Sequence, residues 1–162
     1  MKAIYPGTFD PFTLGHLDIV QRAAPLFSEL KIVVFKSNSK HPSFSFEERA
    51  EMAALSVACI KNVSVDMCAQ LLVDYMRQNG VKYIVRGIRD TIDYEYEKQM
   101  VYINRAMYDE FEPVFLMPTD RYAYISSTVI RDVSVMGGDY SMFLPEAVNE
   151  YIKAKRGDMN HA

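Results

Sequence analysis

Short β-rich runs alternate with amphipathic helical stretches along the sequence, and this alternation constrains the fold more than any other feature. The strongest strand signal is the run from Leu30 to Phe35, whose nearly unbroken hydrophobicity is typical of a strand buried on both faces. Strands that are separated by helices join through right-handed crossovers and form a parallel sheet covered on both faces. The sequence therefore predicts an α/β protein.

Local signals mark where the elements start and end. Ser45 and Glu48 form a capping box at the start of one helix, and Gly80 can end another in the left-handed conformation. Pro25 should distort the last turn of the first helix. Strands are expected at 3–5, 30–35, 63–65, 81–85 and 113–116, and helices at 14–27, 46–58, 69–79, 93–110, 127–137 and 145–157. We predict a Rossmann-like, doubly wound sheet of five parallel strands with helices on both faces, in a strand order that the pattern does not give.

The composition is that of an ordinary globular protein. The chain has 162 residues, of which 49% are hydrophobic, so we expect one domain over residues 1–162 with a flexible tail from about residue 157. Eighteen basic and 21 acidic residues give a net charge of −3, which argues against a protein that coats nucleic acid. The sequence has no apolar run of the roughly 20 residues needed to cross a bilayer, and its two cysteines lack motif spacing. We therefore expect a cytoplasmic protein with no membrane or nucleic-acid partner.

Ligands of such a sheet bind outside the carboxyl ends of its strands, which here are followed by segments 6–16, 36–43, 66–72, 86–90 and 117–128. These segments contain residue types that bind phosphate, namely Thr8, His16, Lys40, Arg86, Arg89, Ser126, Ser127 and Thr128. Any one of them could be an ordinary surface residue, yet cations and helix starts gather at one edge of an acidic chain. A phosphate carries about −1.5 to −2 charges, so we predict that this edge binds polyphosphate.

The first of these segments joins a strand to a helix between Gly7 and His16. It has neither the glycine spacing of the dinucleotide fingerprint nor the Gly-Lys pair of a P-loop. Gly15 permits a close backbone approach, and His16 lies at a helix start, where free N–H groups and the helix dipole favour an anion. A histidine in this place is often a surface or capping residue, but the surrounding segment favours a phosphate ligand.

A second helix start carries three consecutive hydroxyl groups, those of Ser126, Ser127 and Thr128. They could donate to phosphate oxygens beside the free backbone N–H groups. The alternative is plain N-capping, for which a single serine suffices. Arg131 lies one helical turn further on and could face either the site or solvent.

These two segments resemble the motifs of the nucleotidyltransferase superfamily. Thr13-x-Gly15-His16 is similar to the first motif, and the run from Ile125 to Arg131, Ile-Ser-Ser-Thr-x-x-Arg, is similar to the second. Three further stretches narrow the resemblance to the bacterial phosphopantetheine adenylyltransferases: residues 5–11, residues 86–89 (Arg-Gly-Ile-Arg) and residues 93–97.

The resemblance implies transfer of adenylate from ATP to 4′-phosphopantetheine, which gives dephospho-coenzyme A and pyrophosphate. It implies catalytic roles for His16, Thr8, Lys40 and Arg86, and 4′-phosphopantetheine contacts from Thr8, Lys40, Leu72 and Arg86. The implied ATP-binding residues are Thr8, Phe9, His16, Gly87, Ile88, Arg89, Glu97, Tyr122, Ala123, Tyr124, Ile125, Ser126, Ser127 and Thr128. Mg²⁺ is expected on the ATP phosphates and not in a protein metal site.

Coenzyme A as a feedback inhibitor and a homohexameric assembly are further expectations of the resemblance. The Tyr-rich helix at 93–110 has two interpretations, because its tyrosines could pack on the sheet or line a subunit interface. The competing functions are a cytidylyltransferase or a nicotinate-nucleotide adenylyltransferase of the same superfamily, and a nucleotide-sensing module without turnover.

Overall fold

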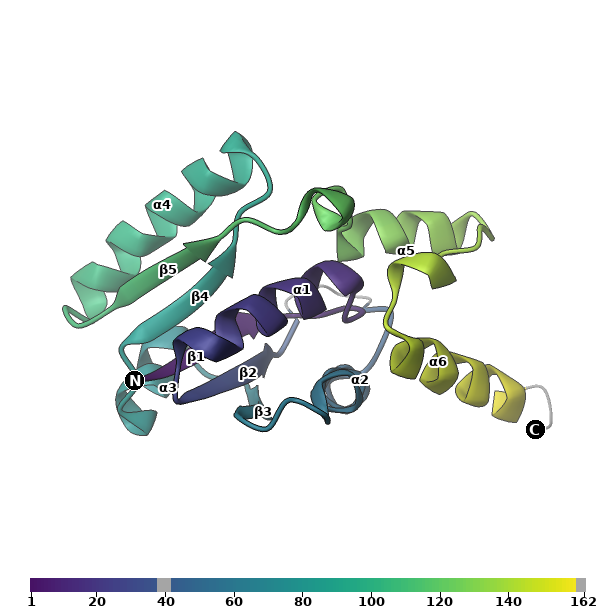
Figure 1. Cartoon of the computed structure of the whole chain (residues 1–162), viewed down its shortest axis with the longest axis horizontal. Helices are drawn as coiled ribbons and strands as arrows, with labels where there is room; N and C mark the ends of the chain where they lie inside the picture. The colour runs from purple at the N-terminus through teal and green to yellow at the C-terminus, as the bar shows by residue number, and fades with distance from the viewer. Residues whose placement is uncertain (38–41, 160–162) are drawn as a thin grey trace.

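The computed structural model describes residues 1–37 and 42–159, which form five strands, six α-helices and three short 3₁₀ helices. The strands are β1 (Lys2–Gly7), β2 (Glu29–Phe35), β3 (Val63–Cys68), β4 (Tyr83–Gly87) and β5 (Glu112–Leu116). The helices are α1 (Leu14–Ala23), α2 (Phe46–Val57), α3 (Leu72–Asn79), α4 (Thr91–Met107), α5 (Ser127–Val135) and α6 (Glu146–Met159). Figure 1 shows their arrangement. The alternation predicted from the sequence is confirmed.

All strand pairs in the sheet are parallel, and the order is β3-β2-β1-β4-β5. The order reverses between β1 and β4, because β2 and β3 lie on one side of β1 while β4 and β5 lie on the other. The predicted doubly wound, Rossmann-like class is therefore confirmed. In such sheets the ligand crevice lies at this switch point, beyond the carboxyl ends of the central strands.

The sheet is buried on both faces, as the alternation of side chains along its strands shows. Tyr5 and Ile32 belong to a core that α1, α2, α5 and α6 cover, whereas Ile4 and Val33 belong to a second core beneath α3 and α4. Neighbouring residues of a strand point to opposite faces, so two adjacent apolar residues serve two different cores. This explains why the β2 run is almost continuously hydrophobic.

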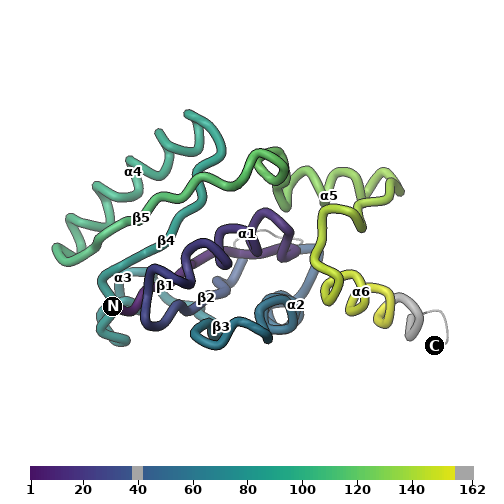
Figure 2. The backbone as a smooth tube through the Cα atoms, viewed as in Figure 1, coloured from purple at the N-terminus to yellow at the C-terminus, as the bar shows by residue number. Residues whose placement is uncertain are grey.

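The C-terminal third of the chain crosses from one side of the molecule to the other. Figure 2 shows the chain leaving β5, passing α1 to form α5, and returning as α6 beside α2. The 3₁₀ turn Asp120–Tyr122 lies in the crossing segment and contacts α1. This path brings the hydroxyl-rich start of α5 next to the loop that follows β1.

Several predicted boundaries hold. Ser45 and Glu48 form the expected capping box, Gly80 ends α3 with a φ of 61°, and a 3₁₀ turn with Pro25 near its start follows α1.

Other boundaries differ from the prediction. β1 continues through Pro6. Its pairing with β4 ends at Ile4↔Ile84, so the backbone N–H that proline lacks is not needed for a hydrogen bond to β4. β3 extends to Cys68, because it pairs with β2 as far as Phe35↔Cys68. The last helix runs past Gly157 to Met159, so the expected end at that glycine is wrong. Residues 160–162 of the expected flexible tail lie outside the described residues.

Most of the tyrosines of α4 are exposed. Tyr94, Tyr96 and Tyr102 are 42%, 59% and 65% exposed, whereas Tyr108, just after the helix, is buried. Tyr108 packs in the core, and the Tyr94 ring meets that of Phe115 in β5 edge-on with ring centres 6.0 Å apart, so packing on the sheet accounts for two of the four side chains. The exposed ones leave an apolar surface on α4.

Candidate functional site

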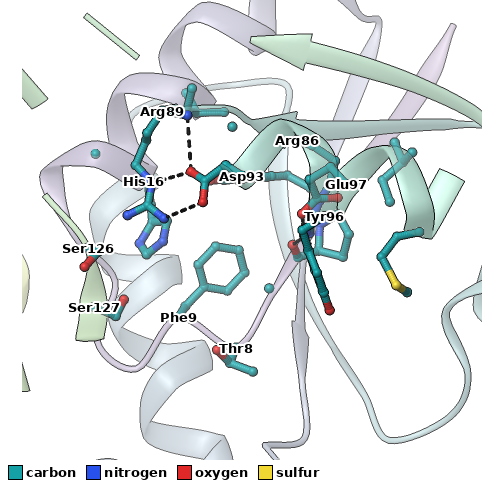
Figure 3. Close-up of a pocket in the computed structure, with 18 of the residues that line it drawn as sticks. Thr8, Phe9, His16, Arg86, Arg89, Asp93, Tyr96, Glu97, Ser126 and Ser127 are labelled. Carbon is teal, nitrogen blue, oxygen red and sulfur yellow. Dashed lines mark hydrogen bonds and ion pairs between the residues drawn. The ribbon is translucent and has the colours of Figure 1, made fainter. Parts of the chain in front are cut away.

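A cavity of about 510 Å³ opens at the carboxyl ends of β1 and β4, at the switch point of the sheet. Many of the predicted site residues line it: Thr8, Phe9, His16, Leu72, Arg86, Gly87, Arg89, Glu97, Tyr122, Ile125, Ser126, Ser127 and Thr128. They come from segments far apart in the sequence, as Figure 3 shows. Three predicted residues, Ile88, Ala123 and Tyr124, are not among the lining residues. Lys40 lies outside the described residues.

The floor of the cavity is the turn that follows β1. Phe9 has a φ of 49°, and its buried ring packs against His16 with their ring centres 5.0 Å apart. Any side chain at Gly7 would meet the Phe9 ring, because a Cβ there would come within 2.8 Å of it. The tight turn leaves Thr8 exposed at the cavity wall.

The structure fixes the tautomer of His16. Its Nδ1 accepts a hydrogen bond from the Thr13 backbone N–H at 3.0 Å, while the Thr13 hydroxyl accepts from the His16 N–H at 3.3 Å. This reciprocal capping box leaves the ring proton on Nε2. Burial, assisted by the positive charge of Arg89, lowers the pKa of His16 from 6.5 to about 3. His16 is thus a neutral donor at pH 7, and it both caps α1 and lines the cavity.

Arg86 and Glu97 form a two-point ion pair across the cavity wall. Arg86 Nε donates to a Glu97 carboxylate oxygen at 2.8 Å, and Nη2 donates to the other oxygen. A third bond runs from Arg86 Nη1 to the Pro6 carbonyl at 2.9 Å. The guanidinium is therefore fixed between β1 and α4, with little freedom to reorient.

Arg89 and Asp93 form a second pair beside His16 (Figure 3). Arg89 Nε and Nη2 donate to the two Asp93 oxygens at 2.8 and 3.1 Å, and the Arg89 backbone N–H donates at 3.2 Å. Burial alone would raise the pKa of Asp93, but the hydrogen bonds and charge of Arg89 outweigh it and lower that pKa. Asp90 caps the same helix start. Both arginines of the cavity are thus held by carboxylates of α4.

Each hydroxyl at the start of α5 already has a protein partner. Ser126 accepts from the Val129 N–H and so caps the helix, and Thr128 accepts from Arg131. Ser127 instead donates its proton to the Pro11 carbonyl at 2.9 Å. Ser126 and Thr128 therefore keep a hydroxyl proton for a ligand, whereas the Ser127 proton is already used.

Arg131 is not among the residues that line the cavity. Its Nη1 donates to the Asp10 carbonyl at 2.9 Å, and it lines a second, smaller hollow between α2, α5 and α6. The sequence left open whether Arg131 faces the site or solvent; its side chain lines this second hollow and is 34% exposed.

Sequence reasoning missed much of the wall that α4 supplies. Asp93, Glu97, Met100 and Asn104 follow the spacing of one helix face, and all four line the cavity. Only the first two belong to the stretches that carried the resemblance. The spacing was visible in the sequence, but the apolar and aromatic residues of the helix favoured a packing role.

The acidic side chains of the cavity are paired with arginines. Among the described residues, no group of three or more His, Cys, Asp or Glu is placed to hold a metal ion. The carboxylates of Asp93 and Glu97 face arginines.

None of the helices in the described part of the chain could span a membrane.

Comparison with known proteins identifies the family. The Cytidylyltransferase-like family model matches residues 4–133. The phosphopantetheine adenylyltransferase of Ralstonia pickettii is 46% identical over 155 residues, which are 96% of this chain and 93% of that protein. The phosphopantetheine adenylyltransferase of Campylobacter concisus is also 46% identical, over 94% of this chain and 98% of that protein. That of Heliobacterium modesticaldum is 44% identical over 96% of the chain.

The chain belongs to the phosphopantetheine adenylyltransferase family. The resemblance to this family is therefore confirmed, and so is the wider nucleotidyltransferase class.

Proposed function

We propose that this protein transfers adenylate from ATP to 4′-phosphopantetheine, forming dephospho-coenzyme A and pyrophosphate. The names of the relatives support the reaction, and the arrangement of donors in one cavity supports the site. The observation that carries the proposal is His16, a neutral Nε2–H donor held at a helix start beside Arg89.

The reaction joins one oxygen of the acceptor phosphate to the α-phosphorus of ATP. The bond from that phosphorus to the β-phosphate oxygen breaks, and pyrophosphate leaves with the bonding pair. The acceptor phosphate is already ionised at neutral pH, so no side chain has to remove a proton. What the protein must supply is positioning and stabilisation of charge.

We assign the site residues to the two substrates, with Thr8 contacting both. We assign His16 Nε2–H to an α-phosphate oxygen, where charge grows as the bonds exchange. We assign the start of α5 and Arg89 to the remaining phosphates of ATP, together with Thr8 and the Phe9 backbone. Thr8, Lys40, Arg86 and the Leu72 backbone are assigned to 4′-phosphopantetheine, and the other implied residues, including Ile88, Ala123 and Tyr124, remain predictions for the nucleotide.

Mg²⁺ belongs to the proposal as a partner of the ATP phosphates. The cavity fits this arrangement, because its two carboxylates face arginines and the phosphates themselves offer hard oxygen ligands. The ion would neutralise part of the triphosphate charge. Ser126 and Thr128 keep protons that can donate to the same phosphates.

The finer expectations of assembly and regulation are proposals as well. A homohexamer would cover the exposed apolar side chains of α4, which are Ile92, Tyr94, Tyr102, Ile103 and Met107. Sedimentation analysis should then give a hexamer, and Tyr102→Glu should dissociate it if this face is the interface. Coenzyme A, which contains the dephospho-coenzyme A product, is proposed to compete for the same cavity. A cytoplasmic location is also proposed, because the proposed reaction uses ATP.

Pyrophosphate release by the purified protein tests the proposal. We expect release that requires both Mg-ATP and 4′-phosphopantetheine, and a loss of about 10²–10³ in kcat for His16→Ala with modest changes in KM. CTP in place of ATP tests the cytidylyltransferase alternative that the family model's description raises. A preference for CTP, or ATP binding without acceptor-dependent release, would refute the assignment.

A further inference from the structure

A buried carboxylate on α1 holds the segment that leads from β5 to α5 (Figure 2). Asp18 is 7% exposed, and its two oxygens accept hydrogen bonds from the backbone N–H and the hydroxyl of Thr119, at 3.0 and 3.1 Å. Arg22, one turn further along α1, donates to the Met117 carbonyl, and its guanidinium lies 3.8 Å from an Asp18 oxygen. Burial of a carboxylate is costly unless its oxygens are hydrogen-bonded, so Asp18 favours this one position of Thr119.

The two α1 residues supply the long-range hydrogen bonds of this segment. Within the described part of the chain, the hydrogen bonds from residues 117–125 to other segments all go to Asp18 and Arg22. Those inside the segment are local, such as the bond from the Tyr122 N–H to the Thr119 carbonyl at 2.8 Å, which closes the 3₁₀ turn. The hydrogen bonding that places the segment therefore depends on α1.

The segment forms one wall of the cavity. Its residues Pro118, Tyr122 and Ile125 line the cavity, whereas Asp18 does not. The wall also passes close to the first turn of α1, because a Cβ on Gly15 would lie 3.4 Å from the Ile125 carbonyl oxygen and 3.5 Å from that of Tyr122. Asp18 can therefore act on a ligand only through the wall that it holds.

We propose that Asp18 is a positioning residue for ATP. Through Thr119 it holds the wall of residues 118–125 against the helix that carries His16. The wall leads directly into the start of α5, so its position sets how far the α5 donors lie from His16. With these donors already in place, ATP binding does not have to order them. This inference rests on the proposed adenylyl transfer, in which residues 122–128 and His16 bind ATP.

The acceptor should depend much less on Asp18. Its proposed contacts with Leu72 and Arg86 lie on α3 and β4, which the Asp18 hydrogen bonds do not reach. Arg86 is held instead by Glu97 and by the Pro6 carbonyl. Loss of the Asp18 contacts should therefore raise the KM for ATP and leave that for 4′-phosphopantetheine nearly unchanged.

Steady-state kinetics of Asp18→Ala test the proposal. This change removes both acceptor oxygens, so ATP binding would have to order the wall. We expect the KM for ATP to rise about tenfold or more, whereas the KM for 4′-phosphopantetheine and kcat change less than about threefold. Titration calorimetry with ATP alone should show the same loss of about tenfold in Kd.

Asp18→Asn separates the hydrogen bonds from the charge. Its amide oxygen can accept the Thr119 N–H while its amide NH₂ donates to the Thr119 hydroxyl, so both contacts can persist. We expect an ATP KM within about threefold of the wild type for this variant. In the double variant Asp18→Asn/Thr119→Val the amide NH₂ faces a methyl group, and the ATP KM should rise as in Asp18→Ala.

Asn62→Ala is the matched control. The Asn62 side chain donates to the carbonyls of Ala24 and Phe27 at 2.8 and 3.0 Å, so this change also removes two hydrogen bonds between distant segments. These contacts lie near the amino ends of β2 and β3, away from the cavity. We expect a lower unfolding temperature with both KM values unchanged, which is the result that a purely structural role would also give for Asp18→Ala.

The proposal is wrong if folded Asp18→Ala keeps the ATP KM within about twofold of the wild type, or if both KM values rise together. It is also wrong if Asp18→Asn alone weakens ATP as much as Asp18→Ala does. If Asp18→Ala does not fold, the double variant carries the same measurements. Failure of the proposed function looks different, because the wild type would then release no acceptor-dependent pyrophosphate, and the ATP titration would still test Asp18.

Discussion

His16 should make the stability of the ligand-free protein fall between pH 7 and pH 5. Its pKa is about 3 in the folded chain against 6.5 when unfolded, so in this window the unfolded chain binds a proton that the folded chain does not. Stability then rises with pH, and the contribution is lost as pH falls below the unfolded value. From these two pKa values the loss between pH 7 and pH 5 is about 2 kcal/mol. Water reaches part of the half-buried ring, so we expect about 1–2 kcal/mol.

The variant His16→Asn isolates this contribution. An asparagine oxygen can take the place of Nδ1 and accept the Thr13 N–H, but it does not titrate. His41, His161 and every carboxylate are common to both proteins, so the difference between their pH dependences belongs to residue 16. Urea unfolding at pH 7 and pH 5, at one protein concentration, gives the two free energies for each protein.

We expect the wild type to lose about 1–2 kcal/mol more than His16→Asn between the two pH values. Equal losses in the two proteins would show that folding does not lower the pKa of His16, and would refute the burial argument on which that lowered pKa rests. A larger loss in the variant would mean that the histidine is stabilised in its charged form.

Three further predictions follow from single contacts. Asp93→Asn should raise the KM for ATP about 2–12-fold in steady-state kinetics, while the acceptor KM stays the same. The Arg89 side chain would lose its fixed orientation, so ATP binding would have to supply the free energy that orders it. Ser126→Ala should cost about 1 kcal/mol in urea unfolding because it removes the cap of α5, and Ser134→Ala in the same helix, which removes no cap, is its control. Gly80→Ala should lower the free energy of unfolding by about 1 kcal/mol. A Cβ at this position would meet no atom within 4 Å, so the cost comes only from the φ of 61°. An unchanged urea midpoint would show that α3 can end without a left-handed residue.

The elements were predictable from the sequence because their signals are local. The Ser45–Glu48 box and Gly80 each act within one turn of helix, so no knowledge of the rest of the chain is needed. The strand order was not predictable, since a βα repeat fits several orders and only packing selects one. Pro6 shows the same limit, because whether a strand tolerates proline depends on how far its neighbour pairs with it.

Some residues of the candidate site were predictable from local signals, whereas others depend on how distant segments pack. His16 and the α5 hydroxyls lie at helix starts that the sequence marks, and their gathering follows from the parallel sheet. The burial of Arg49 could not be predicted from the sequence, because an arginine on an amphipathic helix normally faces solvent. Its burial depends on the carbonyls of Thr8 and Phe35, which come from two other segments.

The pairing of charges determines how this cavity can bind two anions. Arg86 and Arg89 each carry a carboxylate partner, so these two pairs contribute almost no net charge. Among the cavity residues that the structure describes, attraction for phosphate then comes from directed donors, which are His16 Nε2–H, the free hydroxyl protons at α5 and the N–H groups of two helix starts. Such donors keep their orientation when the ligand is absent, and they need no reorganisation as charge moves to the leaving pyrophosphate. Donors fixed in this way stabilise the arrangement in which charge is being exchanged more than they stabilise bound substrate or product.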